Sequence, residues 1–206
     1  MAYSPVAVKP QSTIANLRPL YFMDAITALH SRNSVNLLTE PGPTREQLQD
    51  IIKAGLRACD HKDLRPWRYL LIEGDARYKL GPLLVAAKAV ADGVPVPLEL
   101  VAKLNTKPFR APTIIAIAAH ITFHPKVPEI EQILSAGASA QMMMAAAHAL
   151  GVGAIWRSGS PMFTQEMRDG LGFEANDQLI GFLYLGTPKA RKELPDLDPA
   201  DFLRTF

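Results

Sequence analysis

The sequence has a single cysteine, Cys59, among 206 residues, which excludes an intramolecular disulfide and a thiolate cage around a metal. The sequence also lacks a large excess of one charge, because its 22 Lys and Arg nearly balance its 20 Asp and Glu and leave a net charge of +2. No nucleic-acid or anionic-membrane surface is therefore indicated. The uncharged apolar run over residues 111–119 has nine residues, against about 20 needed to span a bilayer, and predicts a buried strand.

The N-terminus lacks the apolar stretch of roughly 7–15 residues that a secretory signal contains. Together with the single cysteine, this favours a reducing, cytoplasmic location. Apolar residues make up 48% of the chain, which is enough to build one core. Residues 1–21 show no periodicity and are predicted to form an arm, residues 22–188 the domain, and residues 189–206 a charged tail.

Common catalytic motifs are absent: the chain has no GxGxxG, GxxxxGK[ST], GxSxG or HExxH segment. His120 and His124 end a predicted strand, where residues four apart lie about 13 Å from each other. Surface or turn histidines are favoured over a metal pair, and no metal site is predicted. Cys59 falls on the apolar face of its predicted helix, so a buried thiol is favoured over a nucleophile.

Apolar periodicity predicts helices alternating with strands. Helices are expected at residues 23–29, 44–59, 75–91, 97–105, 128–150 and 164–171, and strands at 67–72, 113–119, 153–156 and 178–185. Thr44 and Gln47 have the spacing of a capping box, which makes the start of the second helix the best defined. Strands separated by long helices favour an α+β or α/β fold.

The helix predicted at residues 128–150 is apolar on nearly every side. From residue 133 onward its only polar side chains are Ser135, Ser139, Gln141 and His148. Such a helix should be buried all round, and a chain of this length has little room for one. We therefore expect it to be shared between the core and a dimer interface.

Two polar clusters lie where predicted elements end. Arg32, Asn33 and Ser34 offer a guanidinium, an amide and a hydroxyl that could hold a phosphate or a polyol, although exposed helix ends often carry such residues. The second cluster, residues 156–159, places Trp156 and Arg157 where a strand leaves the core, as at a ligand-lined edge. Arg57 and His61, judged alone, fit solvated surface residues.

Seven segments, in this order and spacing, resemble the nitroreductase family of FMN-dependent oxidoreductases. They are RNS at 32–34, AGLRA at 54–58, the loop from DHK at 60–62 to RPW at 65–67, FRAP at 109–112, SAG at 135–137, IWRSG at 155–159 and GFLYLGTP at 181–188. The resemblance implies an α+β, nitroreductase-like fold whose central mixed or antiparallel sheet is flanked by helices. It also implies an intertwined homodimer with FMN at the subunit interface and the tail at 189–206 embracing the partner.

Carried over by position, the resemblance implies a binding site for FMN. Arg32 and Ser34 would hold its phosphate and ribityl chain, and Asn33 would contribute from the same turn. Arg57 and His61 would contact the cofactor near the interface. The flavin would be lined by a third group, Trp156, Arg157 and Ser158.

The implied activity is an NAD(P)H-dependent, nitroreductase-type oxidation and reduction. NADH or NADPH would deliver hydride to flavin N5, and a nitroaromatic, quinone or similar small acceptor would then take the electrons. No catalytic side chain is required, because the cofactor carries the chemistry. Two alternatives remain open at this point: an FMN store or redox sensor without turnover, and a cofactor-free dimerisation module.

Overall fold

The structure is a computed structural model that describes residues 23–190 and 192–206, so the predicted arm at residues 1–21 lies outside the described residues. Its α-helices are α1 (Ala25–Ser31), α2 (Arg45–Gly55), α3 (Ala76–Asp92), α4 (Leu98–Thr106), α5 (Glu129–Ala149) and α6 (Gln165–Gly170). Its strands are β1 (Leu38–Thr39), β2 (Trp67–Glu73), β3 (Thr113–His120), β4 (Gly153–Arg157) and β5 (Asp177–Pro188). Short 3-10 helices are η1 (His61–Asp63), η2 (Lys107–Arg110), η3 (Ser160–Phe163) and η4 (Pro199–Asp201).

All strand pairs of the sheet are antiparallel, and β5 is hydrogen bonded to β3, β4 and β1, while β2 pairs with the far side of β3. The four longer strands and six α-helices agree with the predicted elements to within a few residues, except that α2 ends earlier. The two-residue strand β1 was not predicted, because so short a segment has no periodicity to detect. The α+β prediction is confirmed, with an antiparallel sheet.

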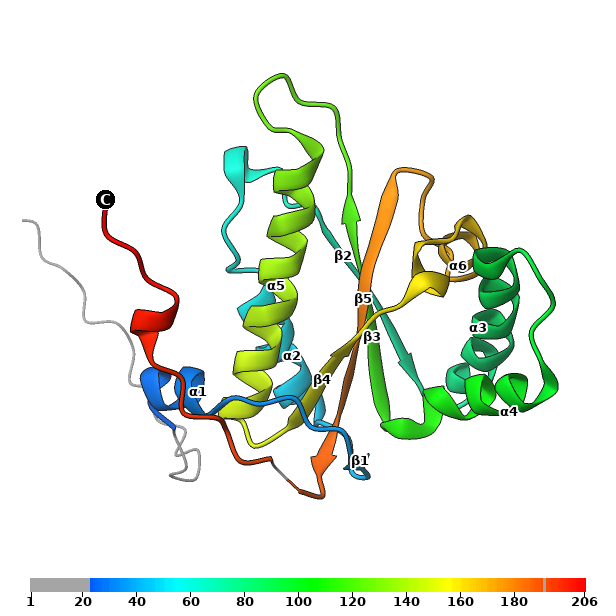
Figure 1. Cartoon of the computed structure of the whole chain (residues 1–206), viewed down its shortest axis with the longest axis horizontal. Helices are drawn as coiled ribbons and strands as arrows, with labels where there is room; N and C mark the ends of the chain where they lie inside the picture. The colour runs from blue at the N-terminus through cyan, green and yellow to red at the C-terminus, as the bar shows by residue number, and fades with distance from the viewer. Residues whose placement is uncertain (1–22, 191) are drawn as a thin grey trace, which may run out of the picture.

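Helices cover both faces of the sheet, with α2 and α5 on one side and α3, α4 and α6 on the other (Figure 1). Successive residues of β3 point to opposite faces, as the pleat requires. Ile114 packs in the α3–α4–α6 core and Ile115 in the α2–α5 core. Because both faces are covered, β3 is apolar from Ile114 to Ala119, without alternating polar residues.

The predicted capping box of α2 is confirmed: the Gln47 backbone N–H donates to Thr44 Oγ1, and the Thr44 N–H donates to Gln47 Oε1. The helix ends at Gly55, where an added Cβ would lie 2.7 Å from Met143 Cγ of α5. The backbone then tightens, with the Arg57 N–H donating to Ala54 O. The prediction of a buried Cys59 was therefore wrong: the chain leaves the helix before reaching it, and the thiol is exposed.

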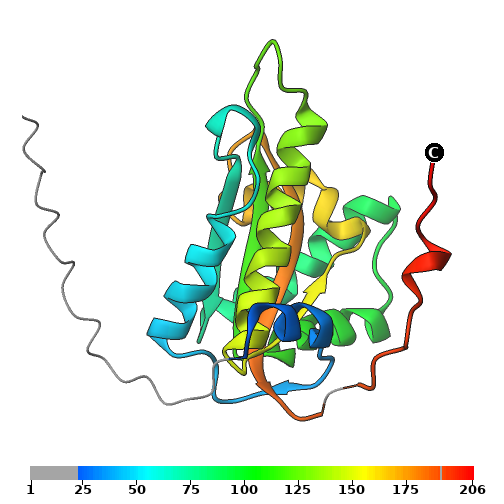
Figure 2. The ribbon, with the colours of Figure 1, turned by 90° about the vertical axis from the view of Figure 1, so that its left-hand side faces the viewer.

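Helix α5 lies along one face of the sheet, and α2 packs beside it (Figure 2). Its inner residues, including Met143 and Ala147, are fully buried, but Leu134 is 62% exposed and Ile130 57% exposed. A single chain thus leaves one face of α5 exposed, where the sequence pattern predicts a dimer partner, and the role of α5 in a dimer interface stays a prediction. Within the described ranges, no helix is long and apolar enough to cross a membrane.

Gly181 in β5 makes room for the indole of Trp156, because an added Cβ would lie 1.8 Å from Trp156 Nε1. We expect Gly181→Ala to lower the free energy of unfolding by about 1–3 kcal/mol, since the indole must leave its place against β5. Urea denaturation measures this change. In a Trp156→Phe background, which lacks the five-membered ring, the same substitution should be less costly; additive effects in this double-mutant cycle would contradict the explanation.

Candidate functional site

The first polar cluster lies directly after α1. The helix ends at Ser31, and Arg32 has an extended backbone at φ −62° and ψ 128°. Three residues on, the Val35 N–H donates to the carbonyl of Ala154 at 2.9 Å. This bond lays the segment that follows the first cluster beside β4, the strand whose end carries the second cluster.

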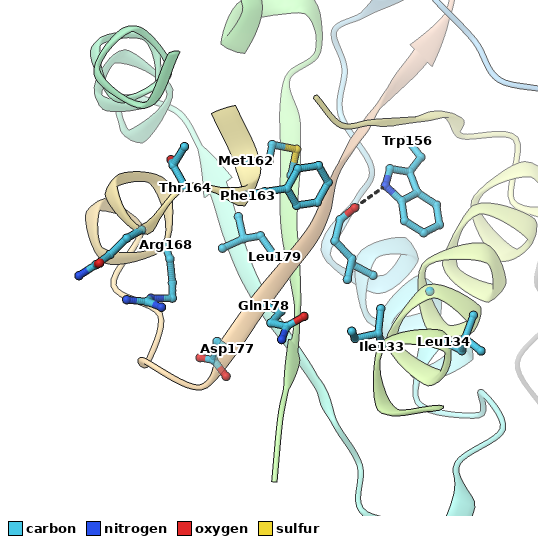
Figure 3. A pocket seen from close by; sticks show the side chains of 13 residues that line it. Ile133, Leu134, Trp156, Met162, Phe163, Thr164, Arg168, Asp177, Gln178 and Leu179 are labelled. Atoms are coloured by element: carbon cyan, nitrogen blue, oxygen red, sulfur yellow. Dashed lines mark hydrogen bonds between the residues drawn. The ribbon is translucent and has the colours of Figure 1, made fainter. Parts of the chain in front are cut away.

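The second cluster lies where β4 ends. The half-buried Trp156 donates its indole N–H to Ile180 O of β5 at 3.2 Å (Figure 3). Arg157 closes the strand, and its guanidinium lies 5.8 Å from the centre of the Tyr184 ring. The chain then passes through exposed Ser158 to Gly159, whose φ of 145° and ψ of 165° suit glycine almost alone. The strand edge is thus held by packing and the loop after it is open to solvent.

Buried polar atoms without a partner are concentrated in these clusters. Within residues 23–190 and 192–206, four buried side-chain nitrogen or oxygen atoms have no hydrogen-bond partner, and three of them are Arg32 Nη1, Asn33 Oδ1 and Arg157 Nε. Leaving such an atom unpaired costs about 1–3 kcal/mol. Two guanidinium donors and an amide acceptor suit a ligand with anionic oxygens and hydroxyl groups, as a phosphorylated polyol has.

The chain that follows β5 passes over the first cluster. Asn33 Nδ2 donates to Lys192 O at 3.0 Å, and the Lys189 N–H donates to Leu37 O at 3.1 Å. Beyond these bonds the tail carries exposed apolar side chains, including Phe202 at 75% exposure. The prediction that residues 189–206 embrace a partner stays a prediction.

His61 lies near the opposite end of α5 from the first cluster. His61 Nδ1 lies 2.7 Å from Glu131 Oε2, near the N-terminal end of α5, whereas Ser31 Oγ lies 2.9 Å from His148 Nε2, near its C-terminal end. At 1.5 Å per residue, these two contacts are separated by about 25 Å along α5. Arg57 is exposed after the end of α2. Within one chain, His61 therefore lies far from the end of α5 that Ser31, beside Arg32, contacts.

Two hollows flank Trp156. One has a volume of about 570 Å³ and lies between α5, η3 and α6; Ile133, Leu134 and Phe163 give it apolar walls (Figure 3). The other, of about 480 Å³, lies between β4, α3, α4 and η2. We call this second hollow the basic pocket, because Lys88, Lys107, Arg110 and Arg157 line it.

Burial and mutual repulsion lower the pKa values of two cations in the basic pocket. Burial lowers the pKa of Lys107, and the nearby Arg110, Arg157 and Lys88 lower it further. The pKa of Arg157 is likewise lowered, first by burial and then by Arg110. Burial raises the pKa of Tyr184 to about 12, although Arg157 and Arg110 act in the opposite direction. The Tyr184 phenol therefore stays neutral. It gives Lys107, Arg110 and Arg157 no negative charge to offset their repulsion.

Sequence reasoning missed the basic pocket. The segments around α3 and α4 showed no chemistry-bearing spacing, because the cations come from three separate elements that only the sheet topology brings together. Arg110 was part of the FRAP segment, but nothing in the linear sequence indicates that it lies near Arg157. The two isolated histidines have structural partners: His120 Nδ1 lies 2.7 Å from Asp177 Oδ1, and His124 Nδ1 accepts the Lys126 N–H.

Residues 29–187 match the family model described as the nitroreductase family. The chain belongs to the nitroreductase family. It is 42% identical over 186 residues to the Escherichia coli (strain K12) protein named "Putative NAD(P)H nitroreductase YdjA", an alignment that covers 89% of this chain and 100% of the relative.

Solved structures show the same fold. A nitroreductase-like family protein from Bacillus cereus has a TM-score of 0.74 at 18% identity, with 90% of this chain and 97% of that chain covered. A Desulfovibrio desulfuricans protein solved in complex with FMN has a TM-score of 0.67 at 22% identity, with 88% and 96% covered.

A substitution of Arg157 measures how much its unpaired buried Nε costs in the free energy of unfolding. In ligand-free protein, Arg157→Met should leave the free energy of unfolding unchanged or raise it by up to about 1 kcal/mol, because it removes a buried charge whose Nε has no partner. Arg77→Met is the matched control: Arg77 donates to Ala111 O and Gly74 O, so its loss should cost about 1–2 kcal/mol. Urea titration of both variants measures this. A loss at Arg157 equal to that at Arg77 would contradict it.

Proposed function

We propose that this protein is an FMN-dependent oxidoreductase that uses NADH or NADPH to reduce a nitroaromatic, a quinone or a similar small acceptor. The observation that carries the proposal is the set of unpaired buried atoms on Arg32, Asn33 and Arg157 in a chain of the nitroreductase family. The name of the Escherichia coli relative, with its NAD(P)H donor, and the FMN in the Desulfovibrio structure support it.

The residues beside β4 have the chemistry to bind FMN. The Arg32 guanidinium would donate to the phosphate, and the Ser34 hydroxyl and Asn33 amide would bind phosphate or ribityl oxygens. Trp156, Arg157 and the exposed Ser158 would lie along the ring. When bound, FMN supplies the redox chemistry, taking a hydride from NAD(P)H at N5 and passing electrons to the acceptor. The protein's part is to orient the ring and to place cations beside it.

Arg57 and His61 would serve a cofactor held by a second copy of the chain. The Glu131 contact of His61 lies about 25 Å along α5 from the His148 contact of Ser31, beside Arg32, too far for one bound FMN to reach both ends; Arg57 is exposed after the end of α2. A two-fold axis across α5 would set two such helices antiparallel, so that the Glu131 end of one meets the His148 end of the other. The exposed Ile130 and Leu134 on α5 support such an arrangement.

The first test is the visible spectrum of purified protein before and after anaerobic addition of NADH and then NADPH. We expect a yellow protein that bleaches with at least one donor. Arg32→Ala should weaken FMN binding by about ten- to a hundredfold, because a charge-assisted bond is worth about 1.5–3 kcal/mol. Arg45→Ala is the control, since Arg45 is exposed and pairs with Glu73.

Two results would contradict the proposal. A colourless protein that does not bind added FMN, together with an Arg32→Ala variant as stable as the wild type, would favour a cofactor-free dimerisation module. Tightly bound FMN with no oxidation of either donor by any acceptor would favour an FMN store or redox sensor.

A mixing experiment tests the contribution of the second copy. Arg32→Ala and Arg57→Ala variants should each bind FMN poorly. After the two are unfolded and refolded together, about a quarter of all sites should regain FMN, because half of a random set of dimers are mixed and each mixed dimer has one intact site. Light scattering measures the dimer. If Arg57 acts on the FMN of its own chain, refolding together restores nothing.

A further inference from the structure

The basic pocket contains more positive charge than its surroundings balance. Lys88 is paired with Asp92. By contrast, Lys107, Arg110 and Arg157 form no ion pair and no side-chain hydrogen bond with the described residues. No Asp or Glu lines the pocket. Arg110 is exposed and Lys107 and Arg157 are half-buried, so these three cations repel one another without a protein anion to offset the repulsion.

The three cations come from two elements and line one pocket. Lys107 and Arg110 belong to η2, just before β3, and Arg157 is the last residue of β4. The Tyr184 ring holds the Arg157 guanidinium from one side at 5.8 Å, and Arg157 Nε is buried without a partner. A carboxylate or phosphate oxygen is the partner that such a donor set fits.

Apolar side chains form a large part of the remaining lining. Leu84, Leu104 and Phe182 are buried and form walls beside the cations. The volume of about 480 Å³ lies within the range of roughly 300–1,000 Å³ for small-molecule sites. An apolar wall next to a group of cations suits a flat ring that carries one anionic group.

We propose that the basic pocket binds the anionic group, carboxylate or phosphate, of a molecule that reacts at the flavin. This proposal rests on the proposed function for the flavin and deepens it by naming a substrate class. The anionic group belongs either to the acceptor, as in an aromatic carboxylate, or to the donor, as in the extra phosphate of NADPH. The pocket adjoins the proposed flavin site through Trp156 and Arg157, which line both.

The test compares 4-nitrobenzoate with 4-nitrobenzamide, which has the same ring and no charge. In the holoenzyme, the Lys107→Gln/Arg110→Gln variant should raise the KM for the acid at least about tenfold relative to that for the amide, because it removes charge-assisted contacts. Lys103→Gln on α4 is the matched control: this exposed lysine does not line the pocket, and both KM values should stay as in the wild type.

The ratio of the KM values for NADPH and NADH in the same variants identifies the source of the anion. If this ratio rises about tenfold and the acid-to-amide ratio does not, the pocket binds the donor's phosphate. If neither ratio changes, the proposal is overturned. Loss of FMN from the Lys107→Gln/Arg110→Gln variant also overturns it, because the pocket would then hold the cofactor's own phosphate.

Calorimetric titration of the two nitro compounds into purified protein, without a donor, separates this proposal from the proposed function. Preference for the acid that disappears in the Lys107→Gln/Arg110→Gln variant supports the pocket even if the protein oxidises neither NADH nor NADPH. Turnover of both compounds with no preference for the acid, in binding or in KM, leaves the proposed function standing and rejects the pocket.

Discussion

The antiparallel pairing of β4 with β5, from Gly153 opposite Gly186 to Arg157 opposite Phe182, is the constraint on which both parts of the candidate site depend. It sets the direction in which Trp156 and Arg157 leave the sheet, and it exposes the Ala154 carbonyl that receives the Val35 N–H. Because Gly181 has no side chain, the indole of Trp156 can pack directly against β5. Without the pairing, the segment after α1 would have no edge beside which to lie.

Unpaired cations at this edge show how stability is traded against binding. The fold buries donors of Arg32 and Arg157 without giving them acceptors, and it places Lys107 and Arg110 where they repel Arg157. Each such group weakens the ligand-free protein, because a buried donor loses its water without gaining a partner. The same groups become favourable contacts when an anion enters. We therefore read the instability as a property of the site and not of the core.

Local sequence patterns predicted the elements well and their meeting points poorly. The capping residues Thr44 and Gln47 defined the start of α2, because a cap depends only on neighbours along the chain. Its end was missed: Cys59 keeps the apolar spacing, but the helix ends at Gly55, which packs closely on α5. The residues proposed to bind FMN were predicted through family likeness, whereas Lys107 and Arg110 lie near Arg157 only because of the order of the strands, which no local pattern contains.

The exposed stripe on α5 and the divided site are two observations that one two-fold arrangement would explain. Leu134 and Ile130 leave apolar surface in water, and the contacts of His61 and Ser31 lie about 25 Å apart along the same helix. No side-chain movement within a chain could close that gap. An antiparallel partner helix would bury the stripe and, by the same rotation, bring Arg57 and His61 of one copy toward Arg32 of the other. The two copies would then form two equal sites, each needing residues from both chains.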